Sequence, residues 1–191
     1  MPAPIDRAKR EQEIAEAAFR LLSERGPAAL TLKALAAELG GSITLVTHVY
    51  ANRAALLKGI TDHAVADYDR ELAHLERGAD DRRRLRILLE WMLPLTAEEQ
   101  RRERGRVMLV TQRESDLNVN AFYVAMDRKM RQLLHDHLAP LVPPDRIEPT
   151  VELLRTMANG VVLSVTERPT KWTRKRQLAL LDDTLDLLGL R

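Results

Sequence analysis

The stretch Thr31–Leu57, "TLKALAAELGGSITLVTHVYANRAALL", decides the fold. Its apolar residues recur at helical spacing, stop at the double glycine Gly40-Gly41, and resume directly afterwards. Thr31 stands where it can cap the first helix, and Ser42 stands where it can cap the second. The stretch therefore predicts two short helices that are joined by a sharp turn.

A sharp turn between two helices has recognisable residue requirements. It needs a small residue where the helices approach, a glycine in the turn, and apolar residues that pack both helices against a third. Ala36 is the small residue and Gly40 is the turn glycine. The packing residues are Leu35, Leu39, Val46 and Val49. Their inward placement turns a second set of side chains outward, namely Ile43, Thr44, Thr47 and His48.

This outward set suits the major groove of double-stranded DNA. Two hydroxyls, an imidazole and an apolar side chain can bond phosphates and base edges and contact a thymine methyl group. Lys33 and Arg53 flank the second helix as predicted phosphate clamps, and Tyr50 at its end completes the predicted DNA-binding set. As caps, Thr31 and Ser42 would also leave backbone N–H groups directed towards phosphates.

Bulk charge does not point to nucleic acid. Residues 1–53 carry seven Lys or Arg against six Asp or Glu, and the whole chain has a formal charge of +2. If DNA is the partner, a few placed groups must bind it. The same spacing also fits two ordinary packed helices in a module that binds a protein, and a helical-bundle enzyme is a third alternative. Sequence-specific retention of DNA would distinguish the three.

The composition indicates a helical globular protein. The 191 residues are 45% hydrophobic and 30% charged, with only 4% aromatic residues and no cysteine. The lack of cysteine excludes disulfides and thiolate metal sites, and we expect a cytoplasmic protein. The N-terminus is charged where a signal peptide needs an apolar run, and no segment has about 18 uncharged apolar residues, so we expect no membrane span.

Apolar periodicity predicts an all-α chain of about nine helices. The first carries Ile14 to Leu22 and ends at Gly26-Pro27. The others run over about 32–39, 42–50, 53–75, 85–92, 97–110, 119–138, 144–167 and 174–188. Thr173 is the predicted cap of the last helix, and Gly189 ends it. We expect a DNA-binding domain over residues 1–53 and a ligand-binding and dimerisation domain over 54–191.

Three segments of the N-terminal part resemble the TetR family of transcriptional regulators. They are "IAEAAFRLLSERG", "TLKALAAELGGS" and "HVYANRAALL", within a gapless match from about Arg10 to Ile60. The usual turn valine is replaced by Gly41, and the usual aromatic residue of the recognition helix by Thr47. The pair Thr47-His48 is similar to the subgroup that contains betaine-responsive regulators. The resemblance implies a homodimeric regulator, usually a repressor, that binds a palindromic operator and is released by a small-molecule effector.

The C-terminal part resembles the ligand-binding and dimerisation helices of that subgroup. A cluster of large, adaptable side chains suggests an apolar effector pocket, although core filling is the better interpretation for any one of them, because Met commonly fills gaps in a core. The predicted pocket residues are Trp91, Met92, Met108, Gln112, Phe122, Met126, Met130 and Met157. A leucine stripe on the last helix predicts the dimer interface. It consists of Leu178, Leu181, Leu185 and Leu188.

Metal and catalytic sites are not expected. His135 and His137 stand two apart on a helix, so their side chains point in different directions. The arginine runs near residues 82–84 and 101–106 are interleaved with acidic residues, which is typical of solvated helix faces. No nucleophile, base or phosphate-binding loop can be read from the spacing, so we predict no cofactor, no metal and no enzymatic activity.

Overall fold

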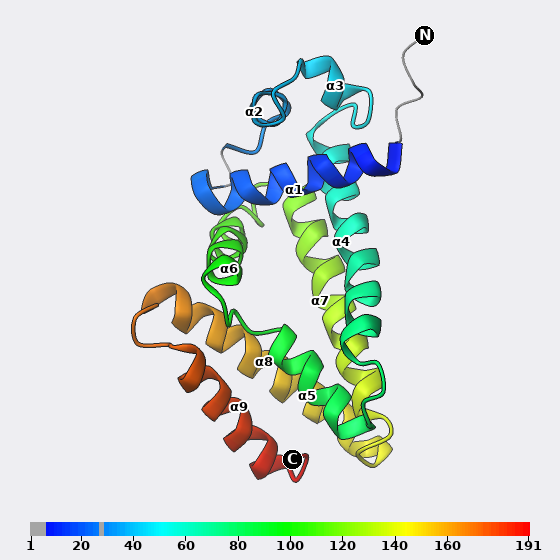
Figure 1. Cartoon of the computed structure of the whole chain (residues 1–191), viewed down its shortest axis with the longest axis vertical. Helices are drawn as coiled ribbons and strands as arrows, with labels where there is room; N and C mark the ends of the chain where they lie inside the picture. The colour runs from blue at the N-terminus through cyan, green and yellow to red at the C-terminus, as the bar shows by residue number, and fades with distance from the viewer. Residues whose placement is uncertain (1–6, 27–28) are drawn as a thin grey trace. The chain divides into compact units, whose positions relative to one another are not determined.

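The computed structural model describes residues 7–26 and 29–191, and within these ranges the chain forms nine α-helices and no strands (Figure 1). The helices are α1 (Arg7–Arg25), α2 (Leu32–Glu38), α3 (Ile43–Thr47), α4 (Arg53–Leu75), α5 (Asp81–Trp91), α6 (Ala97–Val110), α7 (Leu117–Leu138), α8 (Pro144–Glu167) and α9 (Arg174–Leu188). The predicted all-α fold is confirmed. None of the described helices combines the length and apolar composition of a membrane span.

The helices pack as two compact units. The first comprises the described residues of Met1–Asp67 together with Arg104–Met126, and the second comprises Tyr68–Glu103 and Asp127–Arg191. Helices α4, α6 and α7 each contribute residues to both units. The N-terminal helices therefore share a unit with the turn between α6 and α7.

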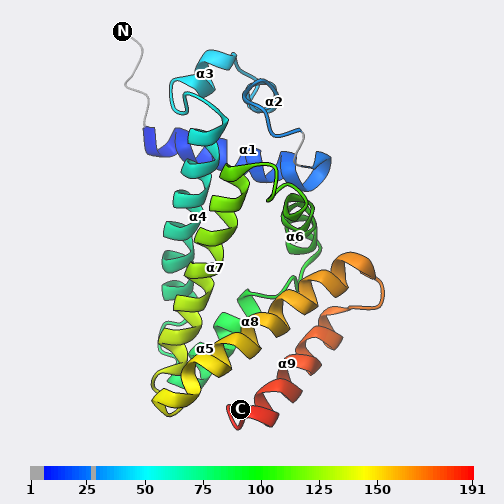
Figure 2. The same cartoon turned by 180° about the vertical axis from the view of Figure 1, so that it is seen from behind.

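The first unit is built around α1 and the start of α4. Helix α1 crosses the N-terminal part of α4 in both views, and α2 packs against α1 and α3 (Figures 1 and 2). Ile14 and Leu21 from α1, Leu35 from α2, Val46 from α3 and Leu56 from α4 are all at most 1% exposed. These side chains form the apolar core that holds the two short helices in place.

Local signals explain where several helices begin and end. The Thr31 hydroxyl accepts from the Ala34 N–H at 3.1 Å, and the Asn52 side-chain oxygen accepts from the Ala55 N–H at 2.9 Å. Thr173 caps α9 in the same way, so the predicted caps Thr31 and Thr173 are confirmed. The predicted end of the first helix lies at Gly26, which has a φ of 74°, whereas Pro27 lies outside the described residues.

The second unit has a continuous apolar core. Helices α8 and α9 lie side by side and run in opposite directions, with α5 beside them in both views (Figures 1 and 2). Leu85 and Leu88 from α5, Leu154 from α8 and Leu181 from α9 are fully buried in this core. Gln177 is also buried, and its amide N–H groups donate to the carbonyl oxygens of Pro94 at 3.1 Å and Trp172 at 3.0 Å.

Candidate DNA-binding site

The turn between α2 and α3 is made by backbone geometry. Gly40 has a φ of 65°, a conformation that favours glycine, and a Cβ there would meet no atom within 4 Å. The Gly41 N–H donates to the Ala36 carbonyl at 2.9 Å, and a Cβ on Gly41 would lie 2.9 Å from the end of the Leu45 side chain. The double glycine thus ends α2 and lets α3 begin two residues later, as predicted.

Helix α3 is shorter than the predicted segment from Ser42 to Tyr50. It ends at Thr47, and His48 and Val49 form a turn in which the Tyr50 N–H still bonds the Val46 carbonyl at 2.9 Å. Val46 is fully buried as predicted, whereas Val49 is only half-buried. The exposed face of this segment therefore lies on α3 and on the first residue of the following turn.

That face carries the predicted outward set. Ile43, Thr44, Thr47 and His48 are all exposed, and Ile43 is 49% exposed although it is a large apolar residue. The Thr47 hydroxyl donates to the Thr44 carbonyl at 3.3 Å, so its lone pairs remain available as acceptors. The face therefore offers two hydroxyls, an imidazole and a methyl-rich side chain within two turns of backbone.

Ser42 occupies the cap position of α3 but does not cap it with its side chain. Its backbone is extended, with a φ of −81° and a ψ of 158°, and its carbonyl accepts from the Leu45 N–H at 3.0 Å. No hydrogen bond joins its hydroxyl to the first turn of α3, which corrects the predicted cap. The exposed hydroxyl is consequently not committed to the helix.

Tyr50 differs from the rest of the predicted DNA-binding set because it is only 7% exposed. Burial, followed by the charge of Glu11, raises the pKa of its phenol above the ordinary value. Its ring packs against Gly59 on α4, so most of the side chain belongs to the core of the first unit. The prediction did not detect this, because an aromatic residue after a short helix carries no local signal of burial.

The two predicted phosphate clamps have different surroundings. Lys33 is exposed on the first turn of α2. Arg53 begins α4, and its guanidinium forms an ion pair with the carboxylate of Asp116, which lies between α6 and α7 in the same unit. Asp116 is a residue that the sequence analysis missed. Its only local signal is its position directly before α7, where it caps that helix.

The predicted effector-pocket residues divide between the two units. Met108, Gln112, Phe122 and Met126 belong to the first, and Trp91, Met92, Met130 and Met157 belong to the second. In the first unit, Met108 lies close to Gly26. A Cβ added to Gly26 would lie 3.2 Å from the terminal methyl group of Met108. In the second, Met130 is part of the apolar core and the other three residues pack against it. The ring of Trp91 also meets that of Tyr68 edge to face at 4.7 Å.

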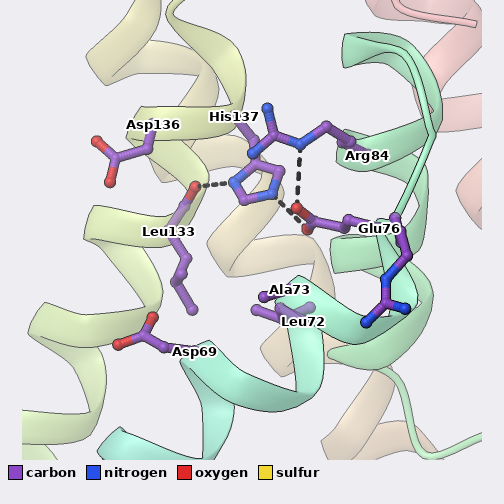
Figure 3. Close-up of a pocket in the computed structure, with 9 residues that line it drawn as sticks. Asp69, Leu72, Ala73, Glu76, Arg84, Leu133, Asp136 and His137 are labelled. Atoms are coloured by element: carbon purple, nitrogen blue, oxygen red, sulfur yellow. Dashed lines mark hydrogen bonds and ion pairs between the residues drawn. The ribbon is translucent and has the colours of Figure 1, made fainter.

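A different cavity, of about 420 Å³, opens in the second unit between the end of α4, the start of α5 and α7 (Figure 3). Figure 3 shows that the carboxylate of Glu76 lies between His137 and Arg84. It accepts from His137 Nε2 at 2.6 Å and from Arg84 Nε at 3.0 Å. The other nitrogen of His137 faces the Leu133 carbonyl at 2.7 Å. These hydrogen bonds fasten the end of α4 to α5 and α7.

The predicted dimer stripe on α9 divides into buried and half-buried residues. Leu181 and Leu185 are at most 2% exposed in the core of their own chain, whereas Leu178 and Leu188 are half-buried. The exposed apolar residues of this region lie elsewhere. They are Leu153 and Leu163 on α8, each 49% exposed, and Leu187 on α9, 89% exposed.

Metal-binding geometry is not found in the part of the chain that the structure describes, where no three His, Cys, Asp or Glu side chains are grouped to hold an ion. His137 is buried against Glu76, while the His135 side chain is 43% exposed.

The glycine turn, the buried packing residues and the exposed face of α3 define a helix-turn-helix protein that binds DNA. Two family patterns match the sequence. "Bacterial regulatory proteins, tetR family" matches residues 14–60, and "BetI-type transcriptional repressor, C-terminal" matches residues 81–189. The chain belongs to the TetR family of transcriptional regulators. This membership supports a DNA-binding regulator over a module that binds only proteins.

Solved structures share the fold over nearly the whole chain. A transcriptional regulator from Rhodococcus sp. Rha1 is 20% identical, with a TM-score of 0.79 and coverage of 93% of this chain and 94% of that one. A regulator from Saccharomonospora viridis in complex with choline is 20% identical, with a TM-score of 0.74 and coverage of 94% and 96%. NalD of Pseudomonas aeruginosa, the secondary repressor of the MexAB-OprM multidrug efflux pump, is 18% identical, with a TM-score of 0.67 and coverage of 95% and 96%. No curated protein matches the chain significantly.

Proposed function

We propose that this regulator is a homodimeric repressor that reads a palindromic operator through α3 and is released from it by a small molecule. The exposed face of α3 carries the proposal. Thr44, Thr47 and His48 can contact base edges or phosphates, and Ile43 can contact a thymine methyl group. A regulator of this kind acts in the cytoplasm, where bacterial DNA lies.

The phosphate contacts fall around this face. Lys33 and Arg53 supply positive charge on either side of it in the sequence, and the hydroxyls of Thr31 and Ser42 supply neutral hydrogen bonds. Residues 1–53 carry nearly equal numbers of positive and negative side chains. Lys33 and Arg53 therefore supply a large part of the electrostatic attraction to DNA. The buried side chain of Tyr50 would hold the end of the recognition segment, residues 43–48, against α4 rather than contact DNA.

The dimer interface is proposed on α8 and α9. Leu153, Gly160 and Leu163 recur along one exposed side of α8 at helical spacing, and Leu187 is the most exposed apolar residue of α9. A Cβ on Gly160 would meet no atom within 4 Å, so no contact in the described part of the chain requires a glycine there. Close approach of a helix from a second copy accounts for it, and two copies of both helices would form a four-helix interface.

The effector is proposed to bind the C-terminal body. Support comes from the choline complex of the Saccharomonospora viridis regulator and from the half-buried Tyr68–Trp91 pair of this chain. Aromatic rings can attract an organic cation through their faces. Trp91 and Trp172 are the two tryptophans of the chain, so Trp172→Phe leaves Trp91 as the fluorescent reporter. Choline should change its emission, whereas the neutral isostere 3,3-dimethylbutanol should not; equal responses would contradict recognition of a cation.

The test of DNA recognition is an operator selected from random DNA, followed by binding titrations of variants. His48→Ala and Thr44→Ala should relax preference at particular base pairs by about 1–3 kcal/mol each where the contacts are direct. Lys33→Ala should weaken binding to all sequences alike and reduce the salt slope by about one. If the α3 variants keep full affinity and base preference while circular dichroism shows an intact fold, then α3 is not the recognition element.

A further inference from the structure

An ion pair joins the start of α4, directly after the predicted DNA-binding helices, to the turn between α6 and α7. The Arg53 guanidinium contacts the Asp116 carboxylate across 63 residues of sequence, and both residues lie in the first unit. Their side chains are 35% and 20% exposed, so the pair is accessible to another charged group. Arg53 is also the cation that follows the recognition segment most closely.

The two oxygens of Asp116 have separate partners. Oδ1 accepts from the backbone N–H groups of Asn118 at 2.9 Å and Val119 at 3.3 Å and so caps α7, while Oδ2 meets Arg53. Burial opposes ionisation of this carboxyl. Hydrogen bonds from Arg53 and from the two backbone groups outweigh that effect and hold the pKa of Asp116 below its ordinary value. The carboxylate is therefore charged and fixed in direction.

The turn that carries Asp116 is itself fastened to α7. The Asp116 N–H donates to the Gln112 carbonyl at 2.9 Å, and Arg113 donates to the Asn120 side-chain oxygen at 3.1 Å. The Arg113 guanidinium also lies over the Tyr123 ring at 5.1 Å. Since Arg113 binds two residues of α7, the turn is held to the start of that helix, and the position of the carboxylate follows it.

We propose that Asp116 competes with an operator phosphate for Arg53. A guanidinium that is paired with a carboxylate attracts phosphate weakly, because the two opposite charges largely cancel at the distance of the DNA backbone. Binding of phosphate by Arg53 then requires the contact with Asp116 to break. The inference rests on the proposed role of Arg53 as a phosphate clamp and adds a residue that controls it.

This arrangement gives the α6–α7 turn a direct influence on DNA affinity. Helices α6 and α7 continue into the second unit, where we place the effector. A shift of the turn towards Arg53 strengthens the ion pair and lowers affinity for the operator, and a shift away frees the guanidinium. The effector would act through differential contact with these two arrangements.

The informative variant is Asp116→Asn. An asparagine keeps a side-chain oxygen for the cap on α7 and removes the charge that holds Arg53. We expect operator binding to become about three- to tenfold tighter, and the slope of log affinity against log salt to steepen by up to about one, because Arg53 then neutralises its phosphate in every complex rather than only in those in which Asp116 has released it. A variant that only damaged the fold would weaken binding instead.

Two controls isolate the contact. Glu114→Gln removes the same charge from the same turn, but Glu114 is exposed and does not pair with Arg53, so its effect on affinity and salt slope should be clearly smaller. In an Arg53→Ala background, Asp116→Asn should lose its effect. Asp116→Glu, which keeps the charge, should leave the salt slope near that of the natural chain.

The outcomes separate this inference from the proposed clamp. If Arg53→Ala weakens operator binding but Asp116→Asn does not tighten it, or tightens it equally without Arg53, the competition is refuted and the clamp stands. If Arg53→Ala changes neither affinity nor salt slope, both fail. Tighter binding and a steeper slope that depend on Arg53 would support the competition.

Discussion

The ring of Tyr50 lies directly against the backbone of Gly59 on α4. A Cβ built on Gly59 would overlap the ring atoms Cε1 and Cζ and the phenol oxygen of Tyr50. Tyr50 is 7% exposed, and in the sequence it comes directly after the turn His48-Val49 that ends α3. Gly59 therefore provides the space that places the end of the recognition segment on α4.

We expect Gly59→Ala to destabilise the protein by about 1–3 kcal/mol, because the new methyl group forces the buried ring to move. The sign of this free-energy change is informative, since replacing glycine by alanine in a helix interior ordinarily stabilises a protein by about 1 kcal/mol. Urea unfolding measures the free energy, and operator binding should fall in parallel. In a Tyr50→Ala background, where the overlap is absent, the same substitution should lose most of its cost. An equal cost in both backgrounds would contradict the contact.

A second prediction concerns the buried charges of Figure 3. His137 lies between two acceptors, since its Nδ1 is 2.7 Å from the Leu133 carbonyl oxygen and its Nε2 is 2.6 Å from the Glu76 carboxylate. The side chains of His137 and Glu76 are 6% and 9% exposed, so this hydrogen bond is shielded from solvent. Glu76→Gln should destabilise the protein by about 3 kcal/mol, because it leaves His137 and Arg84 without their anion.

The matched control for Glu76 is Glu152→Gln. Glu152 also pairs with an arginine, Arg131, at 2.6 Å, but its side chain is 62% exposed. Exposed ion pairs contribute little, so urea unfolding of this variant should nearly coincide with that of the natural chain. Comparable losses at the two glutamates would show that burial does not set the strength of these interactions.

Helix ends were predictable where local chemistry sets them. The bounds of α8 and α9 follow from Pro144 at a helix start, the Thr173 cap and the αL conformation of Gly189, which are all effects of neighbouring residues. The contacts Arg53–Asp116 and Glu76–His137 join residues 63 and 61 positions apart. Such pairings depend on how the helices pack, and a charged residue on a predicted helix looks the same whether it is solvated or paired.

The candidate sites show the same limit. Helical spacing correctly turned Thr44 and His48 outward, because Val46 has to be buried against α2. It also found the leucine stripe of α9, but periodicity does not say whether the same chain or a second copy covers an apolar face. Leu181 and Leu185 proved to be covered by their own chain.

A third prediction follows from the lowered pKa of Asp127. Burial raises this pKa, but hydrogen bonds from Arg131 at 2.7 Å and Arg155 at 3.0 Å hold it below the ordinary value. In the unfolded chain the pKa is about 3.9. The unfolded state thus takes up the proton first as the pH falls. The stabilisation by ionised Asp127 is present above that value and is lost as the pH falls through the folded-state pKa.

The measurement is the difference in unfolding free energy between the natural chain and Asp127→Asn from pH 7 to pH 3. The difference should be constant near neutrality and shrink below about pH 4. Since the Asp127 side chain is 43% exposed, the difference in unfolding free energy at pH 7 should stay below about 1 kcal/mol. A difference that is independent of pH over this range would assign the loss to the altered shape of the side chain rather than to its charge.

The last prediction tests the proposed dimer at Gly160. Leu181→Glu would be a poor probe, because that side chain is fully buried and the substitution would unfold the chain. Gly160→Leu fills open space on the surface of α8 and replaces a poor helix former, so the folded chain should keep its stability or gain about 0.5–1 kcal/mol. If a helix of a second copy approaches this glycine, the added side chain must separate the two copies.

Sedimentation at micromolar concentration should therefore show a dimer for the natural chain and a shift to monomer for Gly160→Leu and for Leu163→Glu. The control is Leu117→Glu, which places the same charge on a leucine that is 84% exposed on α7, outside the proposed interface. It should remain dimeric. Loss of assembly in Leu117→Glu together with unchanged assembly in Gly160→Leu would place the interface on α7 instead. A natural chain that sediments as a monomer would exclude the four-helix interface, and the exposure of Leu153, Leu163 and Leu187 would then need another explanation.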